Sequence, residues 1–419
     1  MDNISNVNVN LNYYKYLDDM FELLRHARKN LPLAKKALLM RVYITLHHFA
    51  PIKAVDECDI VLKKLKQYKM VDDRPFCLSI MELKAHALMN AGLYPDGEIL
   101  LKEIQADWLC NKEILSDETL FDLYDRLAAV YRAFNFIDLS KTYNTLSITL
   151  ADKLDDNRLR ALAYRTKFKI TLYPNMDLSS ESLRKSIEAT ALMPSKRIET
   201  DNSLDVCALE ILSNSTVHQD KLILKLNSML QDIEANNLHR AQIHCFFLLA
   251  ICNLLKGEEK ATLLAKEYVD RAINLSTSYG IVGYLWRLYN LQAIIGIRMG
   301  FDSQHIYKIF FTVFDILKKQ GLLYIGNRDA CEGNILALSN IGYYLQERKF
   351  ESQFYQTMSL VTFAGQEYSA YPNQNLSDNP VNTFLVQQYA KARKREILFA
   401  QNTPPNLLWD TQTRYLLIL

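Results

Sequence analysis

Glycine and proline are scarce in this chain, at 12 and 10 of 419 residues. Sheet proteins with many tight turns use more of both, so this scarcity argues against a β-rich fold. Apolar residues make up 49% of the chain, which is enough for a large core. Neither sign of charge is in excess, because 49 basic residues oppose 47 acidic ones. The resulting net charge of +2 gives no electrostatic reason to expect binding to nucleic acid or to an anionic membrane.

Signatures of catalysis are also missing. The sequence contains no P-loop, GxGxxG, GxSxG or HExxH motif. His239 and His244 fall on different faces of a helix, and adding Cys245 does not complete a tetrahedral metal site. His47 and His48 are adjacent, so their side chains point apart on a helix. The sequence therefore predicts no enzyme activity, no cofactor and no metal site.

The seven cysteines are scattered, and no CxxC pair occurs. We expect them to be free thiols, mostly buried, in a reducing compartment. The N-terminus has no basic region followed by an apolar core, so no signal peptide is predicted. The most apolar run, residues 243–255, is far shorter than the ~20 residues of a membrane span. Together these features predict a cytoplasmic protein with no membrane contact.

The clearest structural signal lies in residues 241–275. The first half is apolar on almost every side, as expected of a helix buried between neighbours. Gly257 then suits a left-handed helix C-cap, and the two glutamates after it suit the first turn of a second helix. Small residues at Ala250 and Ala265 let the two helices approach closely. Because one such hairpin cannot bury its own faces, we expect stacked hairpins, each touching only its neighbours.

The spacing of this hairpin recurs along the chain. A small residue is followed seven residues later by a turn residue and, five residues further on, by a position that opens the second helix. The first members of the eight copies stand at positions 42, 85, 128, 167, 208, 250, 293 and 342. The fourth copy is divergent, because Lys167 occupies the small-residue position. A near-constant period of this size indicates a helical-repeat solenoid.

The pattern resembles the tetratricopeptide repeat family. Ala85, Gly92 and Gly97 match three of that family's signature positions, and Ala250 with Gly257 matches two. The period exceeds the ~34 residues of the standard repeat, and the consensus tryptophan and proline are mostly absent. The chain is more similar to the long-helix, degenerate repeats of bacterial regulatory proteins. Those include sensor parts of large ATP-dependent transcription activators and intracellular receptors for signalling peptides.

The resemblance covers roughly residues 30–360 and implies an all-α fold. This fold is a right-handed α-α superhelix, or tetratricopeptide-like solenoid, of about eight helical hairpins with a period near 42 residues. Residues 1–12 are predicted to be a disordered lead-in and residues 13–362 to form the solenoid. Residues 363–380 contain few aliphatic side chains and two prolines, which predicts a linker or an exposed loop. Residues 381–419 are predicted to be a C-terminal helix and an apolar tail, packed on the solenoid or on a partner.

Two segments near the termini bear on nucleic-acid binding. The C-terminal helix carries KARKRE at 391–396, and four basic residues in six suit a phosphate-contacting patch. A solvated helix face is the favoured interpretation of so short a run. The helix predicted over 13–30 is not followed by a basic recognition helix. The sequence therefore gives no clear sign of nucleic-acid binding.

The resemblance also implies a concave groove for a ligand. In this family, the groove residues stand three residues before, one residue after and four residues after each small residue. Arg287 stands six residues before Ala293 and is expected to face the same side. The residues assigned to the groove are Glu82, His86, Asp125, Arg132, Arg287, Asn290 and Tyr343. Charged and amide side chains suit an extended peptide, whose backbone needs both donors and acceptors. In the central repeat these positions hold Phe247, Ile251 and Leu254, which either close the groove or form an apolar anchor pocket.

These observations favour a protein- or peptide-binding module that acts as a scaffold or sensor in bacterial regulation. An alternative is the sensor arm of a larger ATP-dependent regulator whose nucleotide-binding part lies elsewhere. A helical enzyme acting through scattered polar groups belongs to a different class, and no local motif supports it. The oligomeric state is not predicted by the sequence.

Overall fold

The computed structural model describes most of the predicted solenoid. It covers residues 35–320, apart from 36–37, 40–41, 44, 47–49, 68–72, 135, 173–175, 194 and 214–218, together with 362–363 and 366–367. Several predictions lie outside the described residues: the lead-in at 1–12, the helix at 13–30, the eighth repeat at Gly342, most of the linker at 363–380 and the whole of 381–419.

The described part of the chain confirms the prediction of a helical protein. Residues 35–46 are helical wherever they are described. Thirteen α-helices follow within the described residues: α3 (Pro51–Gln67), α4 (Arg74–Asn90), α5 (Tyr94–Cys110), α6 (Asp117–Ala133), α7 (Ile137–Lys153), α8 (Asn157–Thr171), α9 (Met176–Leu192), α10 (Lys196–Ser213), α11 (Gln219–Ala235), α12 (His239–Lys256), α13 (Glu259–Tyr279), α14 (Leu285–Arg298) and α15 (Ser303–Lys319). The short 3-10 helix η1 (Val282–Tyr284) precedes α14, and two-residue strands β1 (Thr362–Phe363) and β2 (Gln366–Glu367) pair antiparallel.

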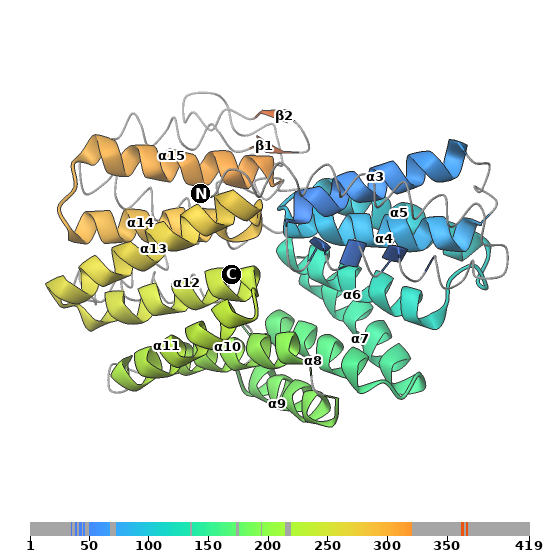
Figure 1. Cartoon of the computed structure of the whole chain (residues 1–419), viewed down its shortest axis with the longest axis horizontal. Coiled ribbons are helices and arrows are strands. Elements are labelled where there is room, and N and C mark those ends of the chain that lie inside the picture. The colour runs from blue at the N-terminus through green and yellow to red at the C-terminus, as the bar shows by residue number, and fades with distance from the viewer. Residues whose placement is uncertain are drawn as a thin grey trace, which may run out of the picture.

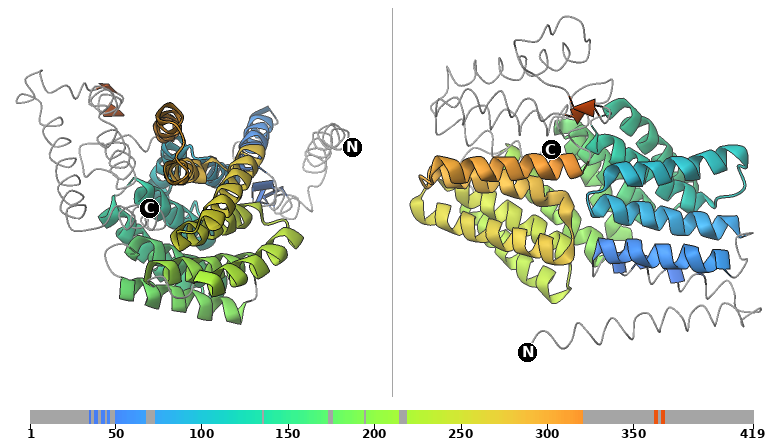
Figure 2. Two further views of the ribbon diagram at one scale, coloured as in Figure 1. Left: turned by 90° about the vertical axis from the view of Figure 1, so that its left-hand side faces the viewer. Right: turned by 90° about the horizontal axis from the view of Figure 1, so that it is seen from above.

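Consecutive helices pack against one another along the described chain, as expected of an α-solenoid. Together they form an arch (Figure 1), in which α3 to α7 build one arm, α8 to α11 the base and α12 to α15 the other arm. The view from above shows the two arms facing each other end to end (Figure 2). The inner side of this arch is therefore bordered by helices from both halves of the sequence.

The recurrent spacing has a packing reason that two hairpins make plain. Between α6 and α7, the hydroxyl of buried Ser140 donates a 2.6 Å hydrogen bond to the carbonyl oxygen of Ala128. Between α4 and α5, a Cβ added to Gly97 would lie only 3.2 Å from the carbonyl oxygen of Ala85. Larger side chains at these positions would push the two helices apart. Six of the predicted small-residue positions are buried: Val42, Ala85, Ala128, Ala208, Ala250 and Ala293.

The predicted turn glycines lie between helices. Gly92, Gly257 and Gly300 have φ values of +79°, +73° and +70°, in the left-handed region that suits glycine. Gly257 is the C-cap of α12, and its amide donates to the carbonyl oxygen of Leu254. The corresponding turn residue of the third repeat, Asn135, lies outside the described residues.

The expectation that each hairpin touches only its neighbours is incomplete, because polar contacts also cross the arch. A side-chain nitrogen of Arg240, on α12, donates a 2.6 Å hydrogen bond to the side-chain oxygen of Asn90, at the end of α4. Arg197, on α10, donates to the hydroxyl of Tyr43 at 3.2 Å. Gln320, after α15, packs closely beside Gly92. The first two contacts join residues 150 and 154 positions apart, and the third joins residues 228 positions apart. The first and third bring the α4–α5 turn against the opposite arm.

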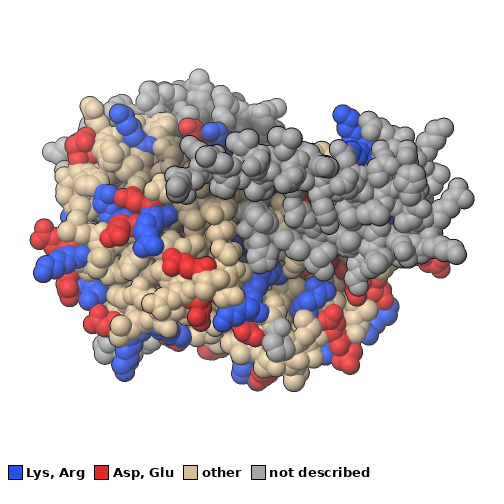
Figure 3. All heavy atoms as spheres, viewed as in Figure 1, with Lys and Arg blue, Asp and Glu red and all other residues tan. Residues whose placement is uncertain are grey.

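The largest buried apolar cluster runs from α10 to α15 and includes Phe247, Ile251 and Leu254. These three predicted groove positions are buried in the core of the central hairpin, at 0–1% exposure. Five of the six described cysteines are buried free thiols, as predicted, and Cys110 is exposed. Charges of both signs are interspersed over the face seen in Figure 3. No helix among the described residues is long and apolar enough to cross a membrane.

Candidate binding pocket

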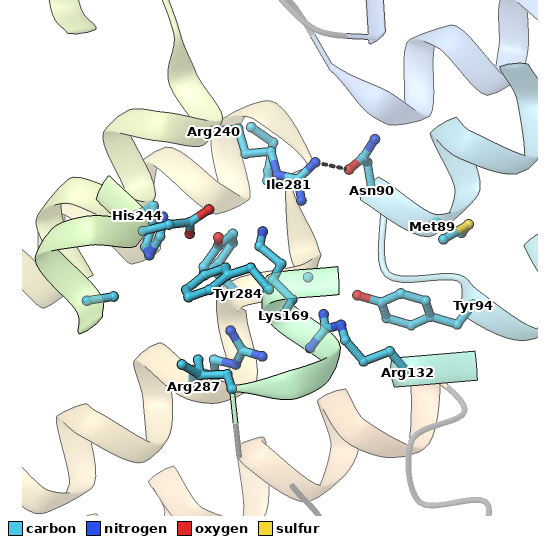
Figure 4. Close-up of a pocket in the computed structure, with 15 residues that line it drawn as sticks. Met89, Asn90, Tyr94, Arg132, Lys169, Arg240, His244, Ile281, Tyr284 and Arg287 are labelled. Carbon is cyan, nitrogen blue, oxygen red and sulfur yellow. Dashed lines mark hydrogen bonds between the residues drawn. The ribbon is translucent and has the colours of Figure 1, made fainter. Parts of the chain in front are cut away.

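A pocket lies on the inner side of the arch, where the α4–α5 turn meets the opposite arm (Figure 4). Its volume is about 110 Å³. A single ordered water needs roughly 10–15 Å³ by a comparable measure, so the pocket has room for a group of several heavy atoms. Its fifteen lining residues are Met89, Asn90, Tyr94, Arg132, Phe168, Lys169, Leu172, Asp205, Ala208, Arg240, His244, Ile281, Gly283, Tyr284 and Arg287.

The charged lining residues are mostly basic. Arg132 comes from the end of α6, Lys169 from α8, Arg240 from the first turn of α12 and Arg287 from the first turn of α14. Figure 4 shows these four side chains converging from different helices. Asp205, on α10, is the only carboxylate among the residues that line the pocket. The lining is therefore strongly cationic, although the chain as a whole is nearly neutral.

Neighbouring groups fix several of these cations. The hydrogen bond from Arg240 to Asn90 holds one guanidinium at the boundary between the two arms. The guanidinium of Arg287 lies 5.8 Å from the ring centre of Tyr284 and 5.3 Å from that of Trp286. Such cation–π contacts stabilise a charged arginine where water is partly excluded. These contacts define the positions of the Arg240 and Arg287 side chains.

Asp205 forms an ion pair with a neighbouring arginine. Arg165, on α8, donates a 2.6 Å hydrogen bond to Asp205 and a 2.7 Å hydrogen bond to Asp201, one turn earlier on α10. Burial by itself would raise the pKa of Asp205, but Arg165 and then Lys169 outweigh it and hold the pKa at about 2. The carboxylate is therefore ionised, and Arg165 takes up most of its charge at the edge of the pocket.

Lys169 and His244 respond to burial in the same direction. Burial, reinforced by the charge of Arg165, lowers the pKa of the Lys169 ammonium to about 7. Burial also lowers the pKa of His244 to about 4, so this imidazole is neutral at physiological pH. Within the described residues Lys169 makes no hydrogen bond or ion pair. The nearby charges of Asp205 and Asp201 favour its charged form and partly offset the effect of burial.

A second charged cluster lies beside the pocket, between α4, α6 and α8. The guanidinium of Arg126 lies 3.1 Å from a carboxylate oxygen of Asp125 and 3.4 Å from one of Glu82. The hydroxyl of Thr166 donates a 2.7 Å hydrogen bond to Asp125. Burial, and then the charge of Asp122, raises the pKa of Glu82. This cluster links three consecutive repeats, because the Glu82–Arg126 ion pair joins α4 to α6 and the hydrogen bond from Thr166 joins α8 to α6.

The structure separates the predicted site residues into two groups. Arg132 and Arg287 line the pocket, although they lie 155 positions apart in the chain. The other described members are buried between helices, with at most 7% of their surface exposed: Glu82, His86, Asp125 and Asn290. Glu82 and Asp125 meet at Arg126, away from the pocket lining. Tyr343 lies outside the described residues.

Sequence reasoning missed Lys169, Arg240 and His244. Lys169 belongs to the divergent repeat, two residues after Lys167, where the small-residue pattern is broken. Arg240 and His244 precede the central groove positions on α12 and reach the pocket because the arms meet there. The one sequence signal was Lys167, because a lysine in a position meant for a small side chain needs a polar space beside it.

No group of histidine, cysteine, aspartate or glutamate side chains that could hold a metal ion occurs in the described part of the chain. No protein-family model matches this chain, and no curated protein matches it either. The resemblance to tetratricopeptide repeats therefore stays a prediction. The pocket must be interpreted from its own chemistry.

Proposed function

We propose that this chain is a binding module, which holds a segment of a protein or peptide against the inner side of its helical arch. The observation that carries the proposal is the cationic pocket, which draws lining residues from both arms. A ligand in this pocket touches α4, α8, α12 and α14 at once. Binding there and the relative position of the two arms are therefore coupled. This suits a scaffold or sensor, and the proposal requires no bond-making chemistry.

The proposal includes a finer description of the fold, a right-handed tetratricopeptide-like superhelix with a period near 42 residues. The spacing of the helices supports that period. The first helices of successive hairpins, α4, α6, α8, α10, α12 and α14, begin at residues 74, 117, 157, 196, 239 and 285. Successive starts are therefore 43, 40, 39, 43 and 46 residues apart. The buried small residues on these helices support the same register.

A peptide selection tests the proposed function. The purified full chain is used as bait against a random peptide library and against peptides from the native cell extract. We expect enriched sequences that bind the wild type, and we expect the double variant Arg132→Gln with Arg287→Gln to lose them. The matched control is Arg184→Gln on α9, because Arg184 is exposed and, among the described residues, pairs with Glu181 and Glu188 on its own helix.

The outcome separates a ligand site from a structural cluster. Loss of binding in the double variant, with an unchanged circular dichroism spectrum and unchanged binding by the control, supports the pocket as the site. Equal binding by wild type and double variant would place the ligand elsewhere. If neither source yields a ligand, the proposed function is wrong.

A further inference from the structure

We propose that the pocket recognises a phosphate monoester group, with the four basic side chains as its donors. This inference deepens the proposed function, because it names the chemical group of the ligand that the inner side of the arch holds. The sources of such a group are a small phosphorylated molecule or a phosphorylated side chain of a peptide. Both present the same dianionic, tetrahedral head.

The balance of charge favours an anion. Three arginines remain charged at any physiological pH, and Lys169 adds part of a fourth charge. The neutral imidazole of His244 adds none. Against them stands Asp205, which already accepts hydrogen bonds from Arg165. Cations gathered in one pocket repel one another unless an anion offsets their charge, so an anionic ligand gains more here than a neutral one.

The directions of the donors favour a tetrahedral anion over a planar carboxylate. The basic side chains enter from α6, α8, α12 and α14, and Figure 4 shows them around the pocket rather than along one wall. A single arginine fork satisfies both oxygens of a carboxylate in one plane. A phosphate monoester offers three oxygens that point in different directions and a charge between −1.5 and −2 at neutral pH. Donors from several helices match that distribution.

Lys169 provides a readout that a merely structural lysine would not give. An anion in contact with the ammonium favours its charged form, so binding raises the pKa of Lys169 from about 7. The site should therefore take up a proton on binding between about pH 7.5 and 8.5, where the phosphate group itself is already a dianion. Affinity should fall as pH rises through this range. The titratable and charged groups that face the ammonium or line the same pocket are Tyr94, Asp125, Arg132, Arg165, Asp201, Asp205, Arg240, His244, Tyr284 and Arg287.

The test is isothermal titration of the full chain at low ionic strength, because salt screens such contacts. The probes are inorganic phosphate, adenosine monophosphate, a capped phosphoserine peptide, its unphosphorylated form and acetate. Running each titration in two buffers of different ionisation heat measures the proton uptake. The variant is Lys169→Gln, and its matched control is Lys260→Gln, an exposed lysine in the first turn of α13. Thermal melts establish that both variants fold.

We expect the phosphorylated probes to bind and the unphosphorylated peptide and acetate to bind at least tenfold more weakly. Removing one charge-assisted hydrogen bond costs about 1.5–3 kcal/mol, so Lys169→Gln should weaken phosphate binding by about ten- to hundredfold and abolish the proton uptake. Lys260→Gln should change neither. Preference for the nucleotide identifies a small-molecule source, and preference for the phosphopeptide identifies a peptide source.

Three results would overturn the inference: no binding of any phosphorylated probe, equal binding of acetate, or unchanged binding and proton uptake in Lys169→Gln. Its failure is distinguishable from that of the proposed function. If selected peptides depend on Arg132 and Arg287 while phosphate does not bind, the module binds peptides through other groups. If phosphate binds through Lys169 while no peptide is selected, the pocket is an anion site and the peptide-binding proposal is wrong.

Discussion

The carboxyl group of Glu57, on α3, should make the free energy of unfolding depend on pH. The side chain is buried, with 1% of its surface exposed. One carboxyl oxygen accepts a 2.8 Å hydrogen bond from the hydroxyl of Thr45, and the other has no hydrogen-bond partner among the described residues. Burial raises the pKa of Glu57 from its ordinary value of 4.5 to about 8. The folded protein therefore keeps this carboxyl protonated at neutral pH.

The sign of the effect follows from proton binding. Above about pH 4.5 the unfolded chain loses this proton while the folded chain keeps it, so the free energy of unfolding falls as pH rises. Between pH 4.5 and about 8, each pH unit lowers the free energy of unfolding by about 1.4 kcal/mol. The penalty is therefore about 2 kcal/mol at pH 6 and about 4–5 kcal/mol above pH 8, as an upper limit that water penetration reduces. Glu57→Gln removes the titrating group and should remove this slope.

The assay is urea unfolding followed by circular dichroism between about pH 5 and pH 9 for wild type and Glu57→Gln. We expect Glu57→Gln to become more stable relative to the wild type as pH rises. Most of this change should fall between the ordinary pKa of 4.5 and the folded-state pKa of about 8. The control is Glu267→Gln, an exposed carboxylate on α13. Parallel pH profiles for wild type and Glu57→Gln would refute the reasoning, because they would mean that Glu57 titrates alike in both states.

Three further substitutions test the packing. Gly97→Ala should lower the free energy of unfolding by about 1–3 kcal/mol, because the new Cβ would lie 3.2 Å from the backbone oxygen of Ala85, and urea unfolding measures this loss. Gly257→Ala should lower the free energy of unfolding by about 1 kcal/mol in the same assay. The cause is the left-handed backbone alone, because nothing lies within 4 Å of an added Cβ. Gly257→Asn should cost less, because asparagine tolerates this conformation better than alanine. Arg165→Met should cost about 3–5 kcal/mol, because two aspartates of α10 lose their ion-pair partner, whereas Arg184→Met on the exposed face should leave the free energy of unfolding nearly unchanged.

The helical hairpins were predictable because their packing is a local requirement. Ser140 touches the carbonyl of Ala128 only twelve residues earlier, and Gly97 stands in the same relation to Ala85. A short spacing of small and turn residues therefore leaves a periodic signal in the sequence. The turn at Gly257 adds a backbone requirement that few other residues meet. Both signals depend on neighbours within one repeat.

The pocket was predictable only in part, because it depends on contacts between distant repeats. Arg132 was found at a groove position that the family resemblance supplies, and Arg287 was found because it faces the same side, six residues before Ala293. Arg240 could not be found in that way, because its place follows from the meeting of α12 with the end of α4. Glu82 and Asp125 occupy groove positions as well, yet Arg126 draws both into a buried cluster. Whether a polar groove residue faces a ligand or a neighbouring charge is decided by packing between repeats.

The contacts across the arch determine what a bound ligand can do to this molecule. A solenoid whose repeats touched only their neighbours would transmit binding as a small change in curvature. Here the hydrogen bond between Arg240 and Asn90 joins the two arms at the rim of the pocket, so the pocket exists in full only when the arms meet. A ligand that contacted Arg132 in one arm and Arg287 in the other would bind the closed arch better than an open one. By linkage, such a ligand would stabilise the closed arch by the same free energy, so the proposed binding would be coupled to the shape of the molecule.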